Sequence, residues 1–341
     1  LPGGAAGERF VLFGVPWSCD DESAIVLFAE DDAGNRASKR ALDGFRPRPP
    51  RQDTIRLSDG FFESVVPAIE SQTPELDRNG TLLERYIRIN AELRKENRAL
   101  LARLSTGTEE AFLWGGAFLQ LPSSARNANF AEMRTYRYGG RVVDRQTHLG
   151  LDLASVARAP VPAANGGVVR FAGFLGIYGN AVVVDHGFGL MSVNAHLSAI
   201  EVAEGQRVAR GESLGRTGAT GLAGGDHLHL GLFLQGTAID PIEWLDPRWI
   251  ERNVSDRLPV DASRKEARPP EDGPVHTLTP ATGLFPPPPK PQPEFEFFLV
   301  ARLLAILLPR PVTVLQTILL AVASAVLLAI AGAILLAIPV A

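Results

Sequence analysis

The order of apolar and polar residues divides the chain into stretches with different periods. Between residues 112 and 255, short apolar runs such as 168–171, 181–184 and 190–193 are separated by glycines. Short and evenly spaced β-rich runs are typical of an antiparallel sandwich or barrel, and not of a sheet with crossover helices. We therefore predict a mainly β domain over residues 112–255, with an antiparallel β-sandwich or barrel-like fold.

The preceding stretch, residues 53–110, has the period of a helix instead. Over residues 82–104 the apolar positions recur at intervals of three, four and seven, and they are Leu82, Tyr86, Ile89, Leu93 and Leu100. This stripe predicts a helix packed on the β domain. A dimerising coil is the alternative, but Glu96 and Asn97 interrupt its seam. A shorter helix is expected over 58–66, with Ser58 as its N-cap and Pro67 ending or kinking it.

Residues 1–45 contain two apolar runs, 9–13 and 24–29, and the second is followed by the turn residues 31–35. Both runs predict short β structure. The words "AEDDAGNRASKRA" resemble the closing hairpin of a bacterial immunoglobulin-like domain, so we expect a partial domain of that kind. The chain starts at Leu1 without a signal segment, which predicts a fragment or a processed product.

The end of the chain has two further segments of biased composition. Residues 259–295 are rich in proline, which predicts an extended, semi-rigid linker. Residues 297–341 are almost wholly apolar, and 312–340 hold no charged residue. A membrane-spanning helix needs about 20 such residues, so we expect a C-terminal apolar helix that anchors the chain in a membrane. A buried core helix and a tail foreign to the natural chain are the alternatives.

Charge, cysteine content and glycine spacing exclude several function classes. The net charge is only −4, which gives no sign of a nucleic-acid partner. The single cysteine, Cys19, excludes an internal disulfide framework and a cysteine-rich zinc module. No G-x-G-x-x-G word follows a predicted strand and opens a helix, so a nucleotide site is not supported.

Histidines are concentrated in the predicted β domain, where five of the six lie between residues 148 and 229. His227 and His229 are two apart and share one face of a strand. His148 and Asp152 are four apart, and a flat strand would separate them by about 13 Å. Imidazole and carboxylate are zinc ligands with bonds of about 2 Å. We therefore predict a bend or bulge at Gly150, or a loop up to it, that lets both side chains reach one ion.

A family resemblance joins these residues to ordered words of the sequence. The words are "THLGLDLA", "APVPAANGGVV", "GIYGNAVVVDHGFGL", "AHLSAI", "VAEGQRVARGESLGRTGATG" and "GGDHLHL". From about residue 130 to 244, roughly a third of the chain, the sequence resembles the zinc metallopeptidases of the lysostaphin or LytM type, which cut peptide bonds in bacterial peptidoglycan.

The resemblance implies a role for each histidine of the site. His148, Asp152 and His229 correspond to the ligands of one Zn²⁺ per chain, which leaves a fourth position for water. His196 and His227 correspond to unligated histidines beside that water. One would take the water's proton and the other would stabilise the developing oxyanion, and which does which stays open.

Two positions depart from the family pattern, and two histidines fall outside it. Asn194 replaces an aromatic residue, which is expected to affect substrate contacts more than the metal. Gly231 replaces an acidic residue, which puts in doubt a carboxylate that would orient a metal-bound imidazole. His186 is expected to be a hydrogen-bonded turn residue, and His276 a solvated one.

These observations predict a zinc-dependent endopeptidase that hydrolyses peptidoglycan peptides with a metal-activated water. Its catalytic domain would lie outside the cytoplasm, in the cell envelope of a bacterium. The alternative is a catalytically silent LytM-like module that binds or activates other cell-wall hydrolases, but all five site residues are kept. A third class, a carrier domain, is suggested by the word "VAEGQRVARGESLG". No lysine occurs between residues 150 and 240 to carry a cofactor.

Overall fold

The structure is a computed structural model that describes residues 10–21, 25–30, 34–40 and 49–258. The predicted linker 259–295 and the predicted membrane segment 297–341 lie outside these ranges, as does His276. Within these ranges no helix has both the length and the apolar character needed to cross a membrane.

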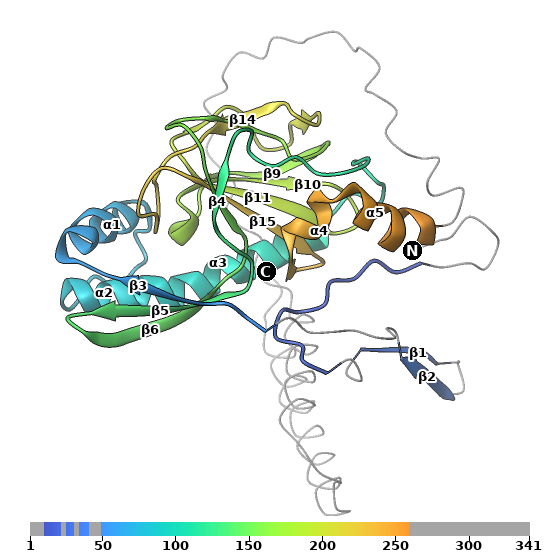
Figure 1. The fold of residues 1–341 in the computed structure, drawn as a ribbon, viewed down its shortest axis with the longest axis horizontal. Coiled ribbons are helices and arrows are strands. Elements are labelled where there is room, and N and C mark those ends of the chain that lie inside the picture. Colours follow the sequence, from blue (N-terminus) through green and yellow to red (C-terminus); the bar gives the residue numbers. More distant parts are fainter. Residues whose placement is uncertain (1–9, 22–24, 31–33, 41–48, 259–341) are drawn as a thin grey trace, which may run out of the picture. The chain divides into compact units, whose positions relative to one another are not determined.

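The largest element is an antiparallel sheet of eight strands (Figure 1). Its order is β13-β9-β10-β11-β15-β7-β4, with β16 paired to β15. The strands are β4 (Ala125–Ala128), β7 (Leu151–Ala154), β9 (Gly167–Phe174), β10 (Asn180–Asp185), β11 (Leu190–Leu197), β13 (Arg207–Val208), β15 (Leu228–Leu234) and β16 (Thr237–Ile239). The predicted runs 168–171, 181–184 and 190–193 lie in β9, β10 and β11, so a large antiparallel sheet is confirmed.

Two smaller sheets flank the large one. The first has the order β12-β14-β8 and consists of β8 (Pro160–Pro162), β12 (Ala199–Ile200) and β14 (Ser213–Arg216). The second has the order β3-β5-β6 and consists of β3 (Gln52–Arg56), β5 (Glu132–Tyr138) and β6 (Arg141–His148). The sequence did not predict β3, which pairs in parallel with β5. Its single apolar residue, Ile55, is too little for a strand pattern.

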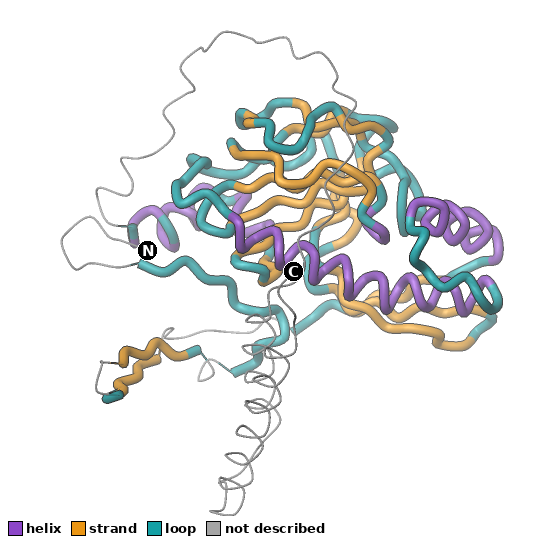
Figure 2. Tube along the Cα trace, turned by 180° about the vertical axis from the view of Figure 1, so that it is seen from behind, coloured by secondary structure: helices purple, strands orange, loops and turns teal. Residues whose placement is uncertain are grey.

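The helices before the β domain are α1 (Asp59–Gln72), α2 (Leu82–Arg88) and α3 (Arg94–Leu104). A π-helical turn, Ile89–Leu93, joins α2 to α3, so the predicted helix 82–104 is confirmed as one continuous stretch (Figure 2). Thr81 and Glu84 form a capping box at its start. Asn97 is a polar residue within the apolar stripe, and its Oδ1 accepts a hydrogen bond of 2.9 Å from the backbone N–H of Ile177 in the β domain. The helix therefore packs on the β domain.

Helix α1 begins as predicted but ends later. Ser58 is its N-cap and accepts a hydrogen bond from the backbone N–H of Phe61. Of the two effects expected of Pro67, an end of the helix is wrong, because α1 continues to Gln72, and a kink stays a prediction. Beyond the proline, Ile69 is fully buried and Glu70 forms an ion pair with Arg85 of α2. These contacts hold the last turns of the helix despite the hydrogen bond that proline removes.

The large sheet has different cores on its two faces because side chains alternate along each strand. Val183 of β10 lies in the core that also contains Val66 and Ile89 of the helices. Its neighbours Val182 and Val184 lie in the core shared with Val161 and Leu214 of the β12-β14-β8 sheet. The large sheet is therefore a central layer, with helices on one face and a small sheet on the other.

A third apolar cluster closes one end of the large sheet. Trp114, Leu232 and Trp244 are buried in it. Short helices follow the last strand, and they are α4 (Pro241–Leu245), α5 (Pro247–Asn253) and the 3₁₀ turn Ser255–Arg257. Two further 3₁₀ turns lie earlier in the chain, at Ser105–Gly107 and Gly176–Tyr178.

The N-terminal part confirms one of its two predicted strands. β1 (Val26–Glu30) and β2 (Arg36–Arg40) form an antiparallel hairpin. The apolar run 9–13 is not a strand where it is described. Phe10 and Leu12 pack against the third cluster instead, and the Phe10 ring stacks on Phe112 with 6.0 Å between centroids. The immunoglobulin-like assignment stays a prediction.

Candidate metal centre

The predicted break at Gly150 separates His148 from Asp152. His148 is the last residue of β6, and Asp152 lies in β7, which belongs to a different sheet. A Cβ atom added at Gly150 would lie 2.6 Å from Nε2 of His229 and 2.8 Å from the carbonyl oxygen of Leu230. Glycine is therefore required where the chain turns against β15, and the turn brings His148 and Asp152 to one point.

His229 lies on the helix-facing side of the large sheet. In β15 it pairs with Asp152 of β7 on one side and with Ala195 of β11 on the other. Leu228 and Leu230 point the opposite way and are each 2% exposed. His227 stands just before β15 and forms an isolated bridge with Gly218. As predicted, His227 and His229 face the same side of the sheet, with buried leucines behind them.

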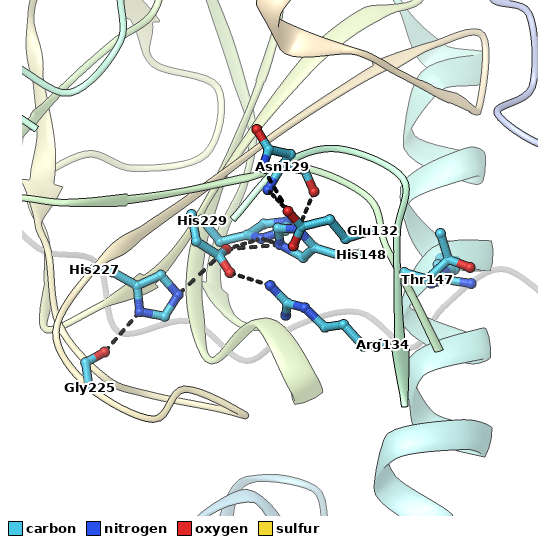
Figure 3. A network of polar contacts seen from close by, with 10 residues as sticks. Asn129, Glu132, Arg134, Thr147, His148, Gly225, His227 and His229 are labelled. Atoms are coloured by element: carbon cyan, nitrogen blue, oxygen red, sulfur yellow. Dashed lines mark hydrogen bonds and ion pairs between the residues drawn. The ribbon is translucent and has the colours of Figure 1, made fainter. Parts of the chain in front are cut away.

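Three side chains converge as a metal site requires (Figure 3). His148 Nε2 lies 2.9 Å from Asp152 Oδ1 and 3.0 Å from His229 Nδ1, and His229 Nδ1 lies 3.0 Å from Asp152 Oδ1. Tetrahedral zinc with bonds of 2.0–2.2 Å places its donor atoms about 3.3 Å apart. The three atoms are therefore close to the spacing that one zinc ion needs, and His148, Asp152 and His229 fit its donor preference.

Neighbouring groups hold two of these side chains in the required state. His148 Nδ1 donates to the carbonyl oxygen of Asn129 at 2.9 Å, so Nε2 presents a lone pair to the centre. Asp152 Oδ2 accepts a hydrogen bond of 2.7 Å from Arg134, which leaves Oδ1 for the metal. In the described residues His229 Nε2 is buried without a partner, and Gly231 of the same strand face has no side chain that could accept its proton.

His196 and His227 lie beside the three ligand-type residues. Their ring centroids are 4.8 Å apart, and the His196 ring is 5.8 Å from that of His229. His196 has a φ of 62° at a bulge in β11, where three residue steps oppose two steps of β10. Bulges redirect side chains next to active sites. The bulge therefore turns His196 toward the same face as His229, although it directly follows Ala195.

Each of these two imidazoles uses one ring nitrogen on the backbone. His196 Nδ1 lies 2.8 Å from the carbonyl oxygen of Thr220, and His227 Nδ1 lies 2.8 Å from that of Gly225. A ring that donates from Nδ1 has a lone pair on Nε2 when neutral. His227 Nε2 lies 3.6 Å from Asp152 Oδ1, at the edge of the ligand group (Figure 3).

The site separates the pKa values of its two spare histidines. Burial holds the pKa of His196 well below its usual value, and the nearby His227 and His229 lower it further. Burial also lowers the pKa of His227, but the hydrogen bond and charge of Asp152 outweigh it, so the pKa is raised above 6.5. Groups with pKa values pushed apart are suited to different proton-transfer roles.

Several residues of the site carry no signal in the sequence. Arg134 reaches Asp152 only because β5 pairs with β6, which ends at His148. Tyr178 is buried, with its ring 5.5 Å from His229. Neither residue has a neighbour in sequence that would indicate the contact.

Asn194 and His186 lie apart from this group. His186 Nδ1 is 2.7 Å from the carbonyl oxygen of Gly166, and Nε2 is 2.9 Å from Ser192 Oγ, which confirms a hydrogen-bonded histidine next to a turn. Asn194 is buried, with Nδ2 3.4 Å from Ser192 Oγ. It is not among the residues that line the cavity at the site.

A cavity of about 530 Å³ opens onto the five site residues. Ligand pockets of enzymes have volumes of this order. Part of its wall comes from the segment before the β domain, through residues that include Arg56, Phe61, Tyr86 and Arg94. The helices and β3 therefore shape the access to the candidate metal centre.

The fold and the site together define a β domain with a candidate metal centre and two further imidazoles beside it. Residues 146–241 match the sequence model of the family described as "Peptidase family M23". The match over this segment confirms the resemblance to the lysostaphin/LytM-type peptidases.

Curated relatives match the same part of the chain. The DD-carboxypeptidase/endopeptidase Mpg of Neisseria meningitidis is 42% identical over 120 residues, which cover 35% of this chain and 27% of that protein. The peptidoglycan DD-endopeptidase ShyA of Vibrio cholerae is 34% identical over 130 residues, 37% of this chain and 30% of that protein. The chain thus spans less than a third of either relative.

Among solved structures, the catalytic domain of lysostaphin from Staphylococcus simulans is 26% identical. The superposition covers 38% of this chain and 98% of that domain, with a TM-score of 0.33.

Proposed function

We propose that the chain is a zinc-dependent endopeptidase that hydrolyses peptide bonds in bacterial peptidoglycan. One observation carries the proposal. His148 Nε2, Asp152 Oδ1 and His229 Nδ1 lie 2.9–3.0 Å from one another, with two further imidazoles beside them. Three ligands leave one position of a tetrahedral zinc site open, which is the arrangement of a catalytic and not a structural site.

The relatives support the choice of substrate. Their names, DD-carboxypeptidase/endopeptidase and peptidoglycan DD-endopeptidase, describe peptidases, and the second names peptidoglycan as the substrate. Both match the part of the chain that holds the site. We transfer this substrate class to the chain, together with a place in the cell envelope outside the cytoplasm.

The residues of the site have different proposed roles. Zinc, when bound, supplies a water of lowered pKa and polarises the scissile carbonyl. Asp152 and the two ligand histidines hold the ion, and Arg134 and the carbonyl of Asn129 hold Asp152 and His148 in place. We assign His227, whose Nε2 lies nearest Asp152, to proton transfer. His196 is kept neutral by burial and donates from Nδ1 to the Thr220 carbonyl, so its Nε2 is assigned to accept a hydrogen bond from the attacking water.

A silent binding or activator module on the same fold is the second candidate. Loss of a ligand or of a spare histidine would favour it, yet all five residues are present and adjoin one cavity. The missing partner of His229 Nε2 weakens the orientation of one ligand without removing it. We therefore favour an active enzyme.

The arrangement of the chain around this domain is also a proposal. We assign residues 112–255 to the catalytic domain and 53–110 to a helical segment fixed on it. Asn97 and Arg98 support this, since they bond to the backbone of Ile177 and Thr147. A partial immunoglobulin-like segment (1–45), a proline-rich linker (259–295) and a membrane anchor (297–341) complete the proposed organisation. A chain ending at Leu258 should leave the membrane fraction and stay active.

Metal analysis together with a cleavage assay tests the function. We expect one zinc per chain, and release of peptides from purified peptidoglycan that stops on chelation and returns with zinc. The metal-loaded chain could instead release no peptide and raise the activity of another wall hydrolase. That result would establish an activator function.

A further inference from the structure

The wall of the cavity that opens onto the metal centre carries positive charge. Three arginines line it, Arg56 from β3, Arg94 from α3 and Arg134 from β5, against a single carboxylate, Asp152. Arg134 is already paired with Asp152 at 2.7 Å. Arg56 and Arg94 form no ion pair with any residue of the described ranges. Two guanidinium charges therefore face the cavity without a carboxylate partner.

Arg94 is held in place by a neutral group. Its Nε donates to the backbone carbonyl of Asn90 at 2.9 Å, and its Nη2 donates to the Asn90 side-chain oxygen. Asn90 is fully buried, and its Nδ2 donates to Asp144 at 2.7 Å. The Asn90 amide is neutral, so it holds the Arg94 guanidinium without cancelling its charge. The carboxylate of Asp144 is bound to Asn90 and does not line the cavity. The fork of Arg94 is thus ordered before any ligand arrives.

A preorganised and unpaired guanidinium is suited to binding a carboxylate. Arginine binds carboxylates through directed, charge-assisted hydrogen bonds. Partly enclosed walls strengthen that attraction by focusing the field. A zinc ion would add further positive charge to the same cavity. The positive charge of the cavity wall therefore favours an anionic ligand over a neutral or cationic one.

We propose that Arg94, assisted by Arg56, is a substrate-specificity site that recognises a free carboxylate of the peptide being cut. This inference rests on the proposed function and deepens it, because it names the class of substrate as acidic peptides. Arg56 and Arg94 both lie before the segment 146–241 that matches the family. The preceding segment thus adds selectivity to a site that the family domain supplies.

The test compares two peptidoglycan peptides that differ only in their side carboxylates, which are free in one and converted to carboxamides in the other. Wild-type chain should cleave the free-carboxylate peptide with a kcat/KM about tenfold higher or more, as a hydrogen-bonded charge pair implies. Arg94→Gln should reduce that ratio toward one by raising KM for the acidic peptide, with kcat little changed. Arg56→Gln should give a smaller change in the same direction.

Two controls separate recognition from a structural effect. Arg207→Gln changes an exposed arginine of β13 that is outside the cavity lining, and it should leave the ratio unchanged. Arg94→Lys keeps the charge but not the fork, and should retain part of the preference. Equal cleavage of both peptides by the wild type, or an unchanged ratio in Arg94→Gln, would overturn the proposal.

A binding measurement keeps this proposal distinct from the proposed function. The zinc-loaded His227→Ala variant is titrated with the same two peptides, and the acidic peptide should bind about tenfold more tightly. If the wild type cleaves neither peptide but this difference is present, endopeptidase activity fails and carboxylate recognition stands. If both peptides are cleaved and bound alike, endopeptidase activity stands and carboxylate recognition fails.

Discussion

Two regions of the large sheet bury histidine side chains, and they do so in different ways. At the end of β10, His186 is fully buried, and each of its ring nitrogens has one partner, the Gly166 carbonyl or Ser192 Oγ. At the metal centre, His229 is also buried, but Nε2 has no partner in the described residues, while Nδ1 lies 3.0 Å from both His148 and Asp152. Burial lowers the pKa of both rings to about 4.

The difference indicates what would distinguish a structural histidine, His186, from the proposed ligand, His229. Both rings are kept neutral, so neither burial nor pKa separates them. His186 satisfies its hydrogen bonds with neutral groups, as buried polar side chains generally do. His229 shares one point with a second imidazole and a carboxylate, an arrangement that only a cation satisfies fully. Removing a ligand should therefore abolish function, whereas removing His186 should cost stability.

The largest effect is expected at the ligands. His148→Ala or His229→Ala leaves two donors, so zinc binding and peptide release should both fall by at least about a thousandfold. Zinc content after dialysis and the rate of peptide release measure the two losses. A variant that retained stoichiometric zinc would remove that residue from the ligand set.

The next effect is expected at His227. His227→Ala should keep one zinc per chain and lower kcat by about 10²–10⁴, which is the usual contribution of a general acid or base. The same zinc and rate measurements check it, with His196→Ala as the companion variant. Cleavage at the wild-type rate would show that His227 has no catalytic role.

His186→Ala should act on stability alone. The change takes the imidazole partner from the Gly166 carbonyl and from Ser192 Oγ, which keeps only its 3.4 Å contact with Asn194, and it opens a cavity. Together these losses cost about 3 kcal/mol of unfolding free energy. Denaturant unfolding measures this loss, and zinc content per folded chain should stay at the wild-type level. Loss of zinc with no loss of stability would place His186 at the metal centre after all.

The same histidine should make stability depend on pH. Its folded pKa of about 4 lies below the unfolded value of 6.5, so the unfolded chain binds a proton first as pH falls. The neutral His186 ring contributes up to about 3 kcal/mol to the free energy of unfolding. This contribution is complete above pH 6.5 and is lost progressively as the pH falls to about 4. Comparing metal-free wild type with metal-free His186→Ala isolates it, and the variant should show the shallower slope. Identical slopes would refute a depressed pKa.

The smallest effect is expected at Arg134, which touches a ligand without being one. Arg134→Gln removes the charge that holds Asp152 Oδ2, and zinc affinity should fall about tenfold. Competition with a zinc-binding dye measures the change, and Arg126→Gln on β4 is a matched control outside the cavity lining. An unchanged affinity would show that Asp152 is positioned by its strand alone.

Local pattern was sufficient for much of the fold and the site. The runs that became β9, β10 and β11, the helix over 82–104 and the bend at Gly150 follow from period and residue type. The continuation of α1 past Pro67 did not follow, because it depends on Ile69 and on the Glu70–Arg85 pair. Such long-range contacts override the local preference of a proline.

The sequence by itself determined which residues have the chemistry of a metal site. Its ordered words indicate His148, Asp152 and His229 as candidate donors, with His196 and His227 as unligated neighbours. Tertiary structure decided their surroundings. Strand pairing brings Arg134 to Asp152, and the packing of helices on the sheet places Arg56 and Arg94 in the wall of the same cavity. Residues so far apart in sequence carry no mutual signal, because only the folded chain brings their charges within interaction distance.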